Sequence, residues 1–470
     1  MMSVVFKNTS ALLVSHTIGR LLSLLLTVLI LPNYFTEQQI GSYLLAMFVT
    51  SLIASITELG MQAPLIREMT LHLKASRHFL GNTLIIRILL SIMAFILMVV
   101  TSKILGYSAE TMMLIKLLGL AELVNGIAQL FRCVFRAFEK MHYEAFTVIA
   151  ERVMTTVVGS GLIILGVDLK DFCVIVLIAG FVNLVLSVSL VRARFTKLAF
   201  NFDLAIWRVI LVQALPFAIG NIFNLIYFRI DMVMLSKLSV DGELANAWYG
   251  LAFTIVNAFT IIPGAFMGAM FPMMSREFEE GTIAFRRSYT NAVRAMLLLG
   301  LPLAIGLSVL ADKVAFLLFS QLEQWQKISQ GLQLLSWSGG LTFLTTVVIT
   351  VLRAADKRRA FTVLMVLTAI LNISINFLII PKWSHIGCSI AMVISESFLL
   401  IVGFIYIHFK ISRLIKIDFV FRIVVLSFTM GAGLILIQKF FPLWLLVLVG
   451  LGFYLGGIWM LGELKANLTH

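Results

Sequence analysis

The chain is dominated by apolar runs of about twenty residues that recur from one end to the other. A helix of that length spans the hydrocarbon core of a bilayer. The segments 80–101 and 360–380 are apolar on every helical face, whereas a helix of a water-soluble protein exposes a polar face. Since 60% of the residues are hydrophobic and 13% are charged, the sequence predicts an all-α, polytopic membrane protein.

About fourteen transmembrane helices are expected. Their predicted bounds are 10–32, 38–60, 80–101, 111–133, 146–166, 171–191, 209–235, 245–271, 291–311, 330–352, 360–380, 387–409, 417–438 and 441–462. The connecting loops are at most about twenty residues long, which is too short for a soluble domain. Whatever the protein does is therefore expected to happen inside the bilayer.

The formal net charge of +13 follows a topological pattern. Alternate loops are rich in Lys and Arg, as in the segment 353–359, whereas the loops between them carry single lysines such as Lys103 and Lys170. The rich loops are expected to be cytoplasmic, which places both termini in the cytoplasm. Because topology accounts for most of the basic excess, we expect membrane lipids and no nucleic acid as partners.

An internal repeat links the two halves of the chain. Arg136-Ala-Phe-Glu-Lys140 precedes an Ala-Phe-Thr-Val segment at 145–148, and Arg353-Ala-Ala-Asp-Lys357 precedes the same four residues at 360–363. The copies lie six predicted spans apart, and an even number gives both the same orientation in the membrane. We therefore expect a pseudo-twofold axis along the membrane normal.

The repeat predicts three parts of the chain. Residues 1–200 would form an N-terminal six-helix lobe, residues 201–412 a C-terminal six-helix lobe, and residues 413–470 a terminal pair of transmembrane helices. Two pseudo-symmetric lobes suit alternating access, in which paired bundles rock around a central site.

Several basic residues lie too deep in the predicted spans to be explained by topology. Arg20 lies about twelve residues from Pro32 at the end of its span, near the bilayer midplane, where a lipid-facing arginine would cost at least about 2.5 kcal/mol. It is expected to line a cavity or to pair with a buried carboxylate. The predicted substrate-binding residues, suited to a phosphate or diphosphate, are Arg20, Arg87, Arg152, Arg229 and Lys116.

Other arginines have a simpler interpretation. Arg132, Arg208, Arg294 and Arg422 lie within about two helical turns of a span end, from which a long side chain can reach the interface. Arg229 stands two residues before Asp231, about 200° away around the helix, so each needs its own partner. Arg229 faces the cavity opposite Arg20 or reaches the outer surface, while Asp231 pairs with another helix.

Carboxylates in the predicted spans have two open roles. Glu58, Glu122, Asp231 and Glu396 are candidates for ion coupling or for structural pairing. Glu151 is expected to form a local or interhelical ion pair, since Arg152 follows it. Cys133, Cys173 and Cys388 are isolated, so no metal site and no cofactor are expected.

Short motifs along some 350 residues carry a family resemblance. They are Leu31-Pro-Asn-Tyr-Phe-Thr36, Glu58-Leu-Gly60, Ile66-Arg-Glu68, Leu215-Pro216, Arg229-Ile-Asp231, Ala269-Met-Phe-Pro272, Leu371-Asn372 and Ile380-Pro381. Their order resembles the oligosaccharide flippases of O-antigen type, in the polysaccharide transport family of the multidrug/oligosaccharidyl-lipid/polysaccharide (MOP) flippase superfamily. The resemblance implies a protein of the cell (inner or plasma) membrane that flips a polyprenyl-diphosphate-linked oligosaccharide outward for polysaccharide biosynthesis.

The resemblance further implies a cationic central cavity and a terminal helix pair that holds the lipid tail. It leaves open whether H⁺ or Na⁺ is coupled and whether polysaccharide assembly proteins bind. An ion-coupled multidrug exporter of the same superfamily is the alternative closest in mechanism. A membrane-embedded polymerase or glycosyltransferase is the alternative enzyme, but the loops are short and no nucleophile or phosphate-loop motif occurs, so we expect no catalytic residues.

Overall fold

The computed structural model describes residues 14–15, 17–58, 60–72, 75–196, 202–413 and 418–460, without the side chains of 215–226, 228 and 282. The described residues form helices and no strands. Twelve of these helices are long and apolar enough to cross a membrane. The prediction of an all-α, multi-pass membrane protein is therefore confirmed.

The difference between fourteen expected spans and twelve helices has two sources. Helix α16 (Arg358–Lys410) contains the predicted spans 360–380 and 387–409, joined at Ser384, whose φ of 50° and ψ of −130° are not helical. Helix α10 (Leu204–Leu238) contains the predicted span 209–235, and its described apolar part, Leu204–Ala214, is too short to be counted as a span.

The chain divides into two compact units. The first comprises Met1–Lys237 and Asp241–Ala247, and the second comprises Leu238–Val240 and Trp248–His470. Helix α10 thus packs with the first unit, and the terminal pair belongs to the second. The three-part division predicted at residues 200 and 412 stays a prediction.

The first unit is built around α6 (Ala109–Ala137), which contacts α3, α4, α5, α7 and α9. The other helices are a first helix, Thr17–Tyr34, which includes the π-helical turn η1 (Leu26–Ile30) and α2 (Leu31–Tyr34), then α3 (Glu37–Ile56), α4 (Gln62–Leu71), α5 (Ser76–Ile104), α7 (Met141–Val153), the π-helical turn η3 (Met154–Val158), α8 (Gly159–Ile164), α9 (Leu169–Arg194) and α10.

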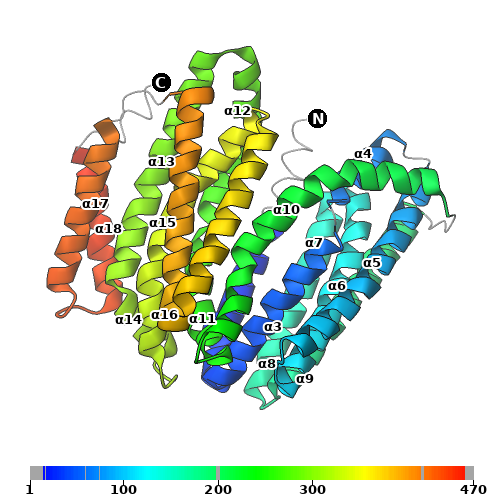
Figure 1. Ribbon diagram of the computed structural model, residues 1–470, viewed down its shortest axis with the longest axis horizontal. Coiled ribbons are helices and arrows are strands. Elements are labelled where there is room, and N and C mark those ends of the chain that lie inside the picture. The colour runs from blue at the N-terminus through cyan, green and yellow to red at the C-terminus, as the bar shows by residue number, and fades with distance from the viewer. Residues whose placement is uncertain are drawn as a thin grey trace. The chain divides into compact units, whose positions relative to one another are not determined.

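In the second unit, α13 and α15 pack closely against each other. A Cβ atom on Gly340 would lie only 2.6 Å from Ala304 Cβ and 2.9 Å from the Gly300 carbonyl oxygen, so small residues allow the helices to touch. Helices α17 and α18 lie beside α13 (Figure 1). The bounds are α11 (Glu243–Phe259), α12 (Ile261–Glu280), α13 (Thr282–Val309), α14 (Ala311–Phe319), α15 (Trp325–Ala354), α16, α17 (Asp418–Ile437) and α18 (Leu443–Met460).

The internal repeat is visible in the backbone. Two residues after the ends of α6 and α15, the chain has a residue with a left-handed conformation, Glu139 at φ 55° and Asp356 at φ 51°. In each copy the next amide, of Lys140 or Lys357, donates to the carbonyl oxygen five residues earlier. This is a helix-terminating motif that usually uses glycine at the left-handed position. Its presence at corresponding positions supports the predicted pairing of the two hairpins.

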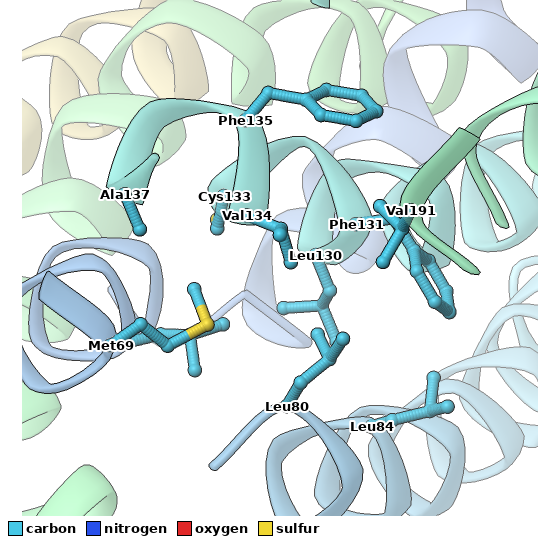
Figure 2. Packing of buried hydrophobic residues seen from close by; sticks show 11 residues of the cluster. Met69, Leu80, Leu84, Leu130, Phe131, Cys133, Val134, Phe135, Ala137 and Val191 are labelled. Carbon is cyan, nitrogen blue, oxygen red and sulfur yellow. The ribbon is translucent and has the colours of Figure 1, made fainter. Parts of the chain in front are cut away.

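An apolar core closes one end of the first unit. Leu65, Met69, Leu80, Phe131 and Val191 come from α4, α5, α6 and α9 and pack in one buried cluster (Figure 2). The cluster packs the end of α6 against α4, α5 and α9. The polar face of the same helix lines the cavity described below.

Residues 243–247, at the start of α11, belong to the first unit, where Glu243 contacts α3 and α6. Its Oε2 atom accepts hydrogen bonds from Ser42 Oγ and Thr111 Oγ1, both at 2.8 Å. Gly41 permits this approach, because a Cβ there would lie 2.9 Å from the Glu243 carbonyl carbon.

Candidate functional site

A cavity of about 330 Å³ lies inside the first unit. Its walls come from the first helix, α3, α5, α6, α7, η3 and α9. The charged and amide side chains that line it are Glu58, Arg87, Glu122, Asn125, Gln129, Arg132, Glu151 and Arg152. Two predicted substrate-binding residues, Arg87 and Arg152, and two predicted carboxylates, Glu58 and Glu122, therefore meet here.

One face of α6 supplies half of these polar groups. Glu122, Asn125, Gln129 and Arg132 follow one another at intervals of three or four residues, which aligns them on one side of a helix. This stripe was not among the sequence predictions, although its spacing is visible in the sequence. It identifies Asn125, Gln129 and Arg132 as further site candidates.

The expectation for Arg132 was wrong. Its side chain is only 12% exposed and its Nη2 atom lies 3.1 Å from Glu151 Oε2, so it does not extend to the membrane interface. Being two turns from a span end permits snorkelling but does not require it, and here a carboxylate on α7 attracts the guanidinium inward.

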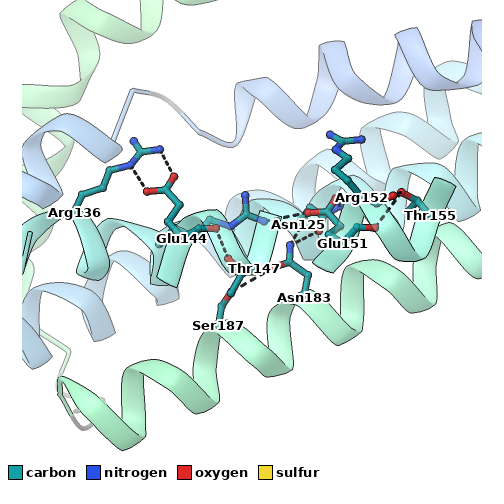
Figure 3. Close-up of polar contacts among 10 residues, drawn as sticks. Asn125, Arg136, Glu144, Thr147, Glu151, Arg152, Thr155, Asn183 and Ser187 are labelled. Atoms are coloured by element: carbon teal, nitrogen blue, oxygen red, sulfur yellow. Dashed lines mark hydrogen bonds and ion pairs between the residues drawn. The ribbon is translucent and has the colours of Figure 1, made fainter. Parts of the chain in front are cut away.

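Glu151 is the centre of a buried hydrogen-bond network (Figure 3). Besides Arg132, it accepts hydrogen bonds from Asn125 Nδ2 at 3.0 Å and Asn183 Nδ2 at 2.8 Å. Its ion pair is thus interhelical, and Arg152 is not the partner. Three donors on α6 and α9 compensate the cost of burying this carboxylate.

Arg87 has an unusual environment. The residue is only 4% exposed, and its Nε atom is buried without a hydrogen-bond partner. Within the described part of the chain, its guanidinium makes no hydrogen bond or ion pair. Gly126 makes room for it, because a Cβ atom there would lie 3.1 Å from Arg87 Cζ and closer still to Nη2. The fold therefore buries a cation and leaves its donors available.

Arg152 also presents free donors. It is exposed within the cavity wall, points away from the Glu151 network in Figure 3, and makes no side-chain hydrogen bond among the described residues. Gly19 of the first helix packs on its aliphatic part, since a Cβ there would lie 3.2 Å from Arg152 Cγ. The π-helical turn η3 follows directly, and such turns often occur at functional sites.

The two remaining carboxylates of the cavity differ in their contacts. Glu58 Oε1 accepts a hydrogen bond from Gln62 Nε2 at 2.7 Å. Glu122 is exposed to the cavity and has no hydrogen-bond partner in the described part of the chain. Three guanidinium groups therefore face three carboxylates, and the lining is formally neutral.

The other predicted residues do not line this cavity. Arg20 and Lys116 are exposed, and Arg229 is half-buried with its Cζ atom 4.5 Å from the Phe48 ring centroid. Asp231 is buried, at 2% exposure, in the first unit. Their proposed roles stay predictions.

Glu396 lies in the second unit, where it is 1% exposed and accepts a 2.9 Å hydrogen bond from Thr345 Oγ1. No cluster of three or more His, Cys, Asp or Glu side chains suited to a metal ion occurs among the residues that the structure describes. The charged and amide side chains of the cavity can form ion pairs and hydrogen bonds with a ligand.

The fold is shared with solved transporters. A lipid II flippase, MurJ, in an inward closed conformation is 17% identical, with a TM-score of 0.78 over 96% of this chain and 98% of its own. An inward-facing multidrug resistance MATE family transporter of the MOP superfamily is 16% identical, with a TM-score of 0.68 over 83% and 93%. A MOP superfamily transporter from Pyrococcus furiosus is 15% identical, with a TM-score of 0.61 over 85% and 94%.

Comparison of sequences gives the family. No protein with a curated description matches the chain significantly. Residues 216–378 match the family described as MatE, and residues 5–278 match the family described as Polysaccharide biosynthesis protein. These matches and the shared fold support a transporter of the MOP superfamily. Because the match over residues 5–278 spans more than half of the 470 residues, the protein belongs to the polysaccharide biosynthesis protein family.

Proposed function

We propose that the protein is a flippase for a polyprenyl-diphosphate-linked oligosaccharide. It moves the lipid from the cytoplasmic to the outer face of the inner or plasma membrane by alternating access, and thereby supplies the synthesis of a cell-surface polysaccharide such as O-antigen. Both termini are cytoplasmic in this proposal. The family match and the flippase fold support the transport class, and the cavity supports the chemical nature of the headgroup.

The burial of Arg87 without a hydrogen-bond acceptor is the observation that carries the proposal. A buried guanidinium without an acceptor costs free energy in the empty protein, and an anion that fills the cavity would relieve that cost. Phosphate oxygens suit this role because a guanidinium can donate to two of them at once. Arg152 offers a second such group from another wall, on α7 rather than α5.

The size of the cavity favours a headgroup over a whole lipid. About 330 Å³ is at the lower end of the range of small-molecule sites. A diphosphate with the adjacent sugar fits this scale, whereas a polyprenyl chain is apolar and lowers its free energy by staying in the bilayer. Sugar hydroxyls could form hydrogen bonds with Asn125, Gln129 and Ser51, which line the same cavity.

A multidrug exporter is the second candidate, and the carboxylates of the cavity and the MatE match favour it. A cationic drug would need available carboxylates. Of the three, however, Glu151 already accepts three hydrogen bonds and Glu58 accepts one, which leaves Glu122. Two guanidinium groups, those of Arg87 and Arg152, make no hydrogen bond among the described residues. The balance of available groups therefore favours an anionic ligand.

The remaining predicted residues extend this proposal. Arg20, Lys116 and Arg229 would contact the substrate at another stage of transport. Glu58, Glu122, Asp231 and Glu396 would couple transport to H⁺ or Na⁺ or would hold the fold. Polysaccharide assembly proteins would receive the flipped lipid at the outer face.

A binding experiment tests the anionic headgroup directly. Purified protein in detergent is titrated with farnesyl diphosphate, a prenyl diphosphate soluble enough for calorimetry, and with farnesol as the matched control without phosphate. We expect the diphosphate to bind at least about 10-fold more tightly, since each charge-assisted hydrogen bond contributes about 1.5–3 kcal/mol.

Transport is then measured in liposomes with a fluorescent polyprenyl-diphosphate disaccharide. The wild-type protein should increase the fraction of lipid that is accessible to an impermeant quencher. Equal affinity for farnesol and farnesyl diphosphate, together with efflux of cationic dyes from the liposomes, would instead establish the exporter.

A further inference from the structure

Asn183 stands behind the cavity wall. It belongs to α9, is fully buried, and is absent from the cavity lining, to which its helix contributes Phe172 and Val176. Nothing in the sequence singles it out, because one Asn in a long apolar helix is an ordinary interhelical contact. Its contacts are more specific than that.

The amide of Asn183 has a defined orientation. Its Nδ2 atom donates to Glu151 Oε2 at 2.8 Å and to Asn125 Oδ1 at 3.1 Å, while its Oδ1 atom accepts from Ser187 Oγ at 3.5 Å (Figure 3). Only a side chain with two N–H donors on one nitrogen can serve both acceptors. Aspartate, of the same shape, would have none when ionised.

This arrangement determines how the charges of the cavity are used. Asn183 and Asn125 fix Glu151, and Glu151 in turn holds the Arg132 guanidinium at the wall with its Nε atom buried and without a partner. One carboxylate is therefore committed to one arginine, and it is kept from Arg152, its neighbour in the chain. Arg87 and Arg152 keep their donors for a ligand.

We propose that Asn183 is a positioning residue for the anion site: through Glu151 it holds Arg132 at the cavity wall and prevents Glu151 from neutralising the arginines that bind the ligand. This inference rests on the proposed function, since it assumes that an anion enters the cavity. The simpler alternative is that Asn183 only joins α6, α7 and α9 and affects stability alone.

Replacing Asn183 with aspartate distinguishes the positioning role from the purely structural role. Two carboxylates within hydrogen-bond distance cannot both ionise at low cost, so a shared proton would restore the bridge to Glu151 at low pH. At high pH both ionise, and repulsion displaces Glu151 and with it Arg132. We expect the affinity of Asn183→Asp for farnesyl diphosphate, relative to wild type at the same pH, to fall about 10-fold between about pH 6 and about pH 9.

Two further variants complete the test. Asn82 is buried in the same unit and accepts hydrogen bonds from the Asp203 amide at 2.9 Å and from Trp207 Nε1 at 3.1 Å, away from the cavity. The Asn82→Asp variant should bind farnesyl diphosphate as tightly as the wild-type protein does at every pH. Asn183→Leu, which has similar volume and no donor, decides the question if Asn183→Asp does not fold, with affinity reduced at least about 5-fold at all pH values.

The outcomes distinguish this inference from the proposed function. If wild-type protein prefers farnesyl diphosphate to farnesol but the Asn183 variants bind it as wild type does, only the positioning role is overturned. If wild-type protein binds farnesyl diphosphate no more tightly than farnesol, both the proposal of an anionic headgroup and the positioning role are overturned. A loss of melting temperature in both Asn183 variants with unchanged affinity in their folded fraction would establish the purely structural role.

Discussion

Farnesyl diphosphate is expected to bind the Arg87→Gln variant on the order of 100-fold more weakly than wild type, while the empty variant melts at the same or a higher temperature. Removing one partner of a buried, charge-assisted contact costs about 2–5 kcal/mol of binding, and about 1.4 kcal/mol is a factor of ten. The stability of the empty protein should not fall and could rise, because a neutral glutamine at this position leaves no buried charge to stabilise. Calorimetry and thermal melting of the same samples measure both quantities.

A loss of affinity without a loss of melting temperature would exclude a structural role for Arg87. If Arg87 held the fold together, its replacement would lower the melting temperature and reduce binding only in proportion to unfolding. Arg192→Gln, which replaces an exposed arginine in the last turn of α9, is the control and should change neither quantity.

Gly126→Ala tests the contact between the Arg87 guanidinium and the ligand without replacing Arg87. The new methyl group would displace the Arg87 guanidinium, so affinity should fall although every charge is kept. Gly161→Ala, in a helical position with open space around it, should bind normally. Normal binding by Gly126→Ala and Arg87→Gln would remove Arg87 from the site.

Loss of the ion pair between Arg136 and Glu144 is expected to have the largest effect on stability. Arg136 Nε lies 2.8 Å from Glu144 Oε2, its Nη2 atom contacts Oε1, and the carboxylate is 1% exposed. Arg136→Gln would leave a buried charge without its partner, at a cost of about 3–5 kcal/mol. The melting temperature should fall by on the order of 5 °C.

The exposed pair in the second hairpin provides the control. Arg358 Nε lies 2.7 Å from Asp356 Oδ1, but the side chains are 76% and 77% exposed, so Arg358→Gln should change stability by less than about 1 kcal/mol. The double variant Arg136→Leu with Glu144→Leu should recover most of the loss, since it removes both charges. Equal effects of Arg136→Gln and Arg358→Gln would show that burial of the first pair does not matter.

Most of the fold followed from the sequence because it depends on patterns that run along the chain. Apolar length predicted the spans, and the repeated hairpins located Glu139 and Asp356 at matching helix ends. The kink at Ser384 could not be anticipated in this way, because a single non-helical residue leaves the hydrophobic pattern intact.

The site was predicted only in part, because depth in a span does not say which way a side chain points. Arg87 and Arg152 do line one cavity, whereas Arg20 and Lys116 do not line it. Arg132 was assigned to the interface from its distance to the span end, and the sequence does not show that Glu151 on another helix pairs with it. Contacts between helices decide such cases, and one sequence read alone does not supply them.

The neutral lining of the cavity has an electrical consequence. With Arg87, Arg132 and Arg152 balanced by Glu58, Glu122 and Glu151, these groups contribute no net charge when the empty protein changes state. Under the proposed function without ion coupling, the charge that crosses the membrane field at this site would then be that of the ligand, at about 2.3 kcal/mol per charge per 100 mV. An inside-negative potential would thus drive a diphosphate outward, and a potassium diffusion potential without effect on the flipping rate would contradict this.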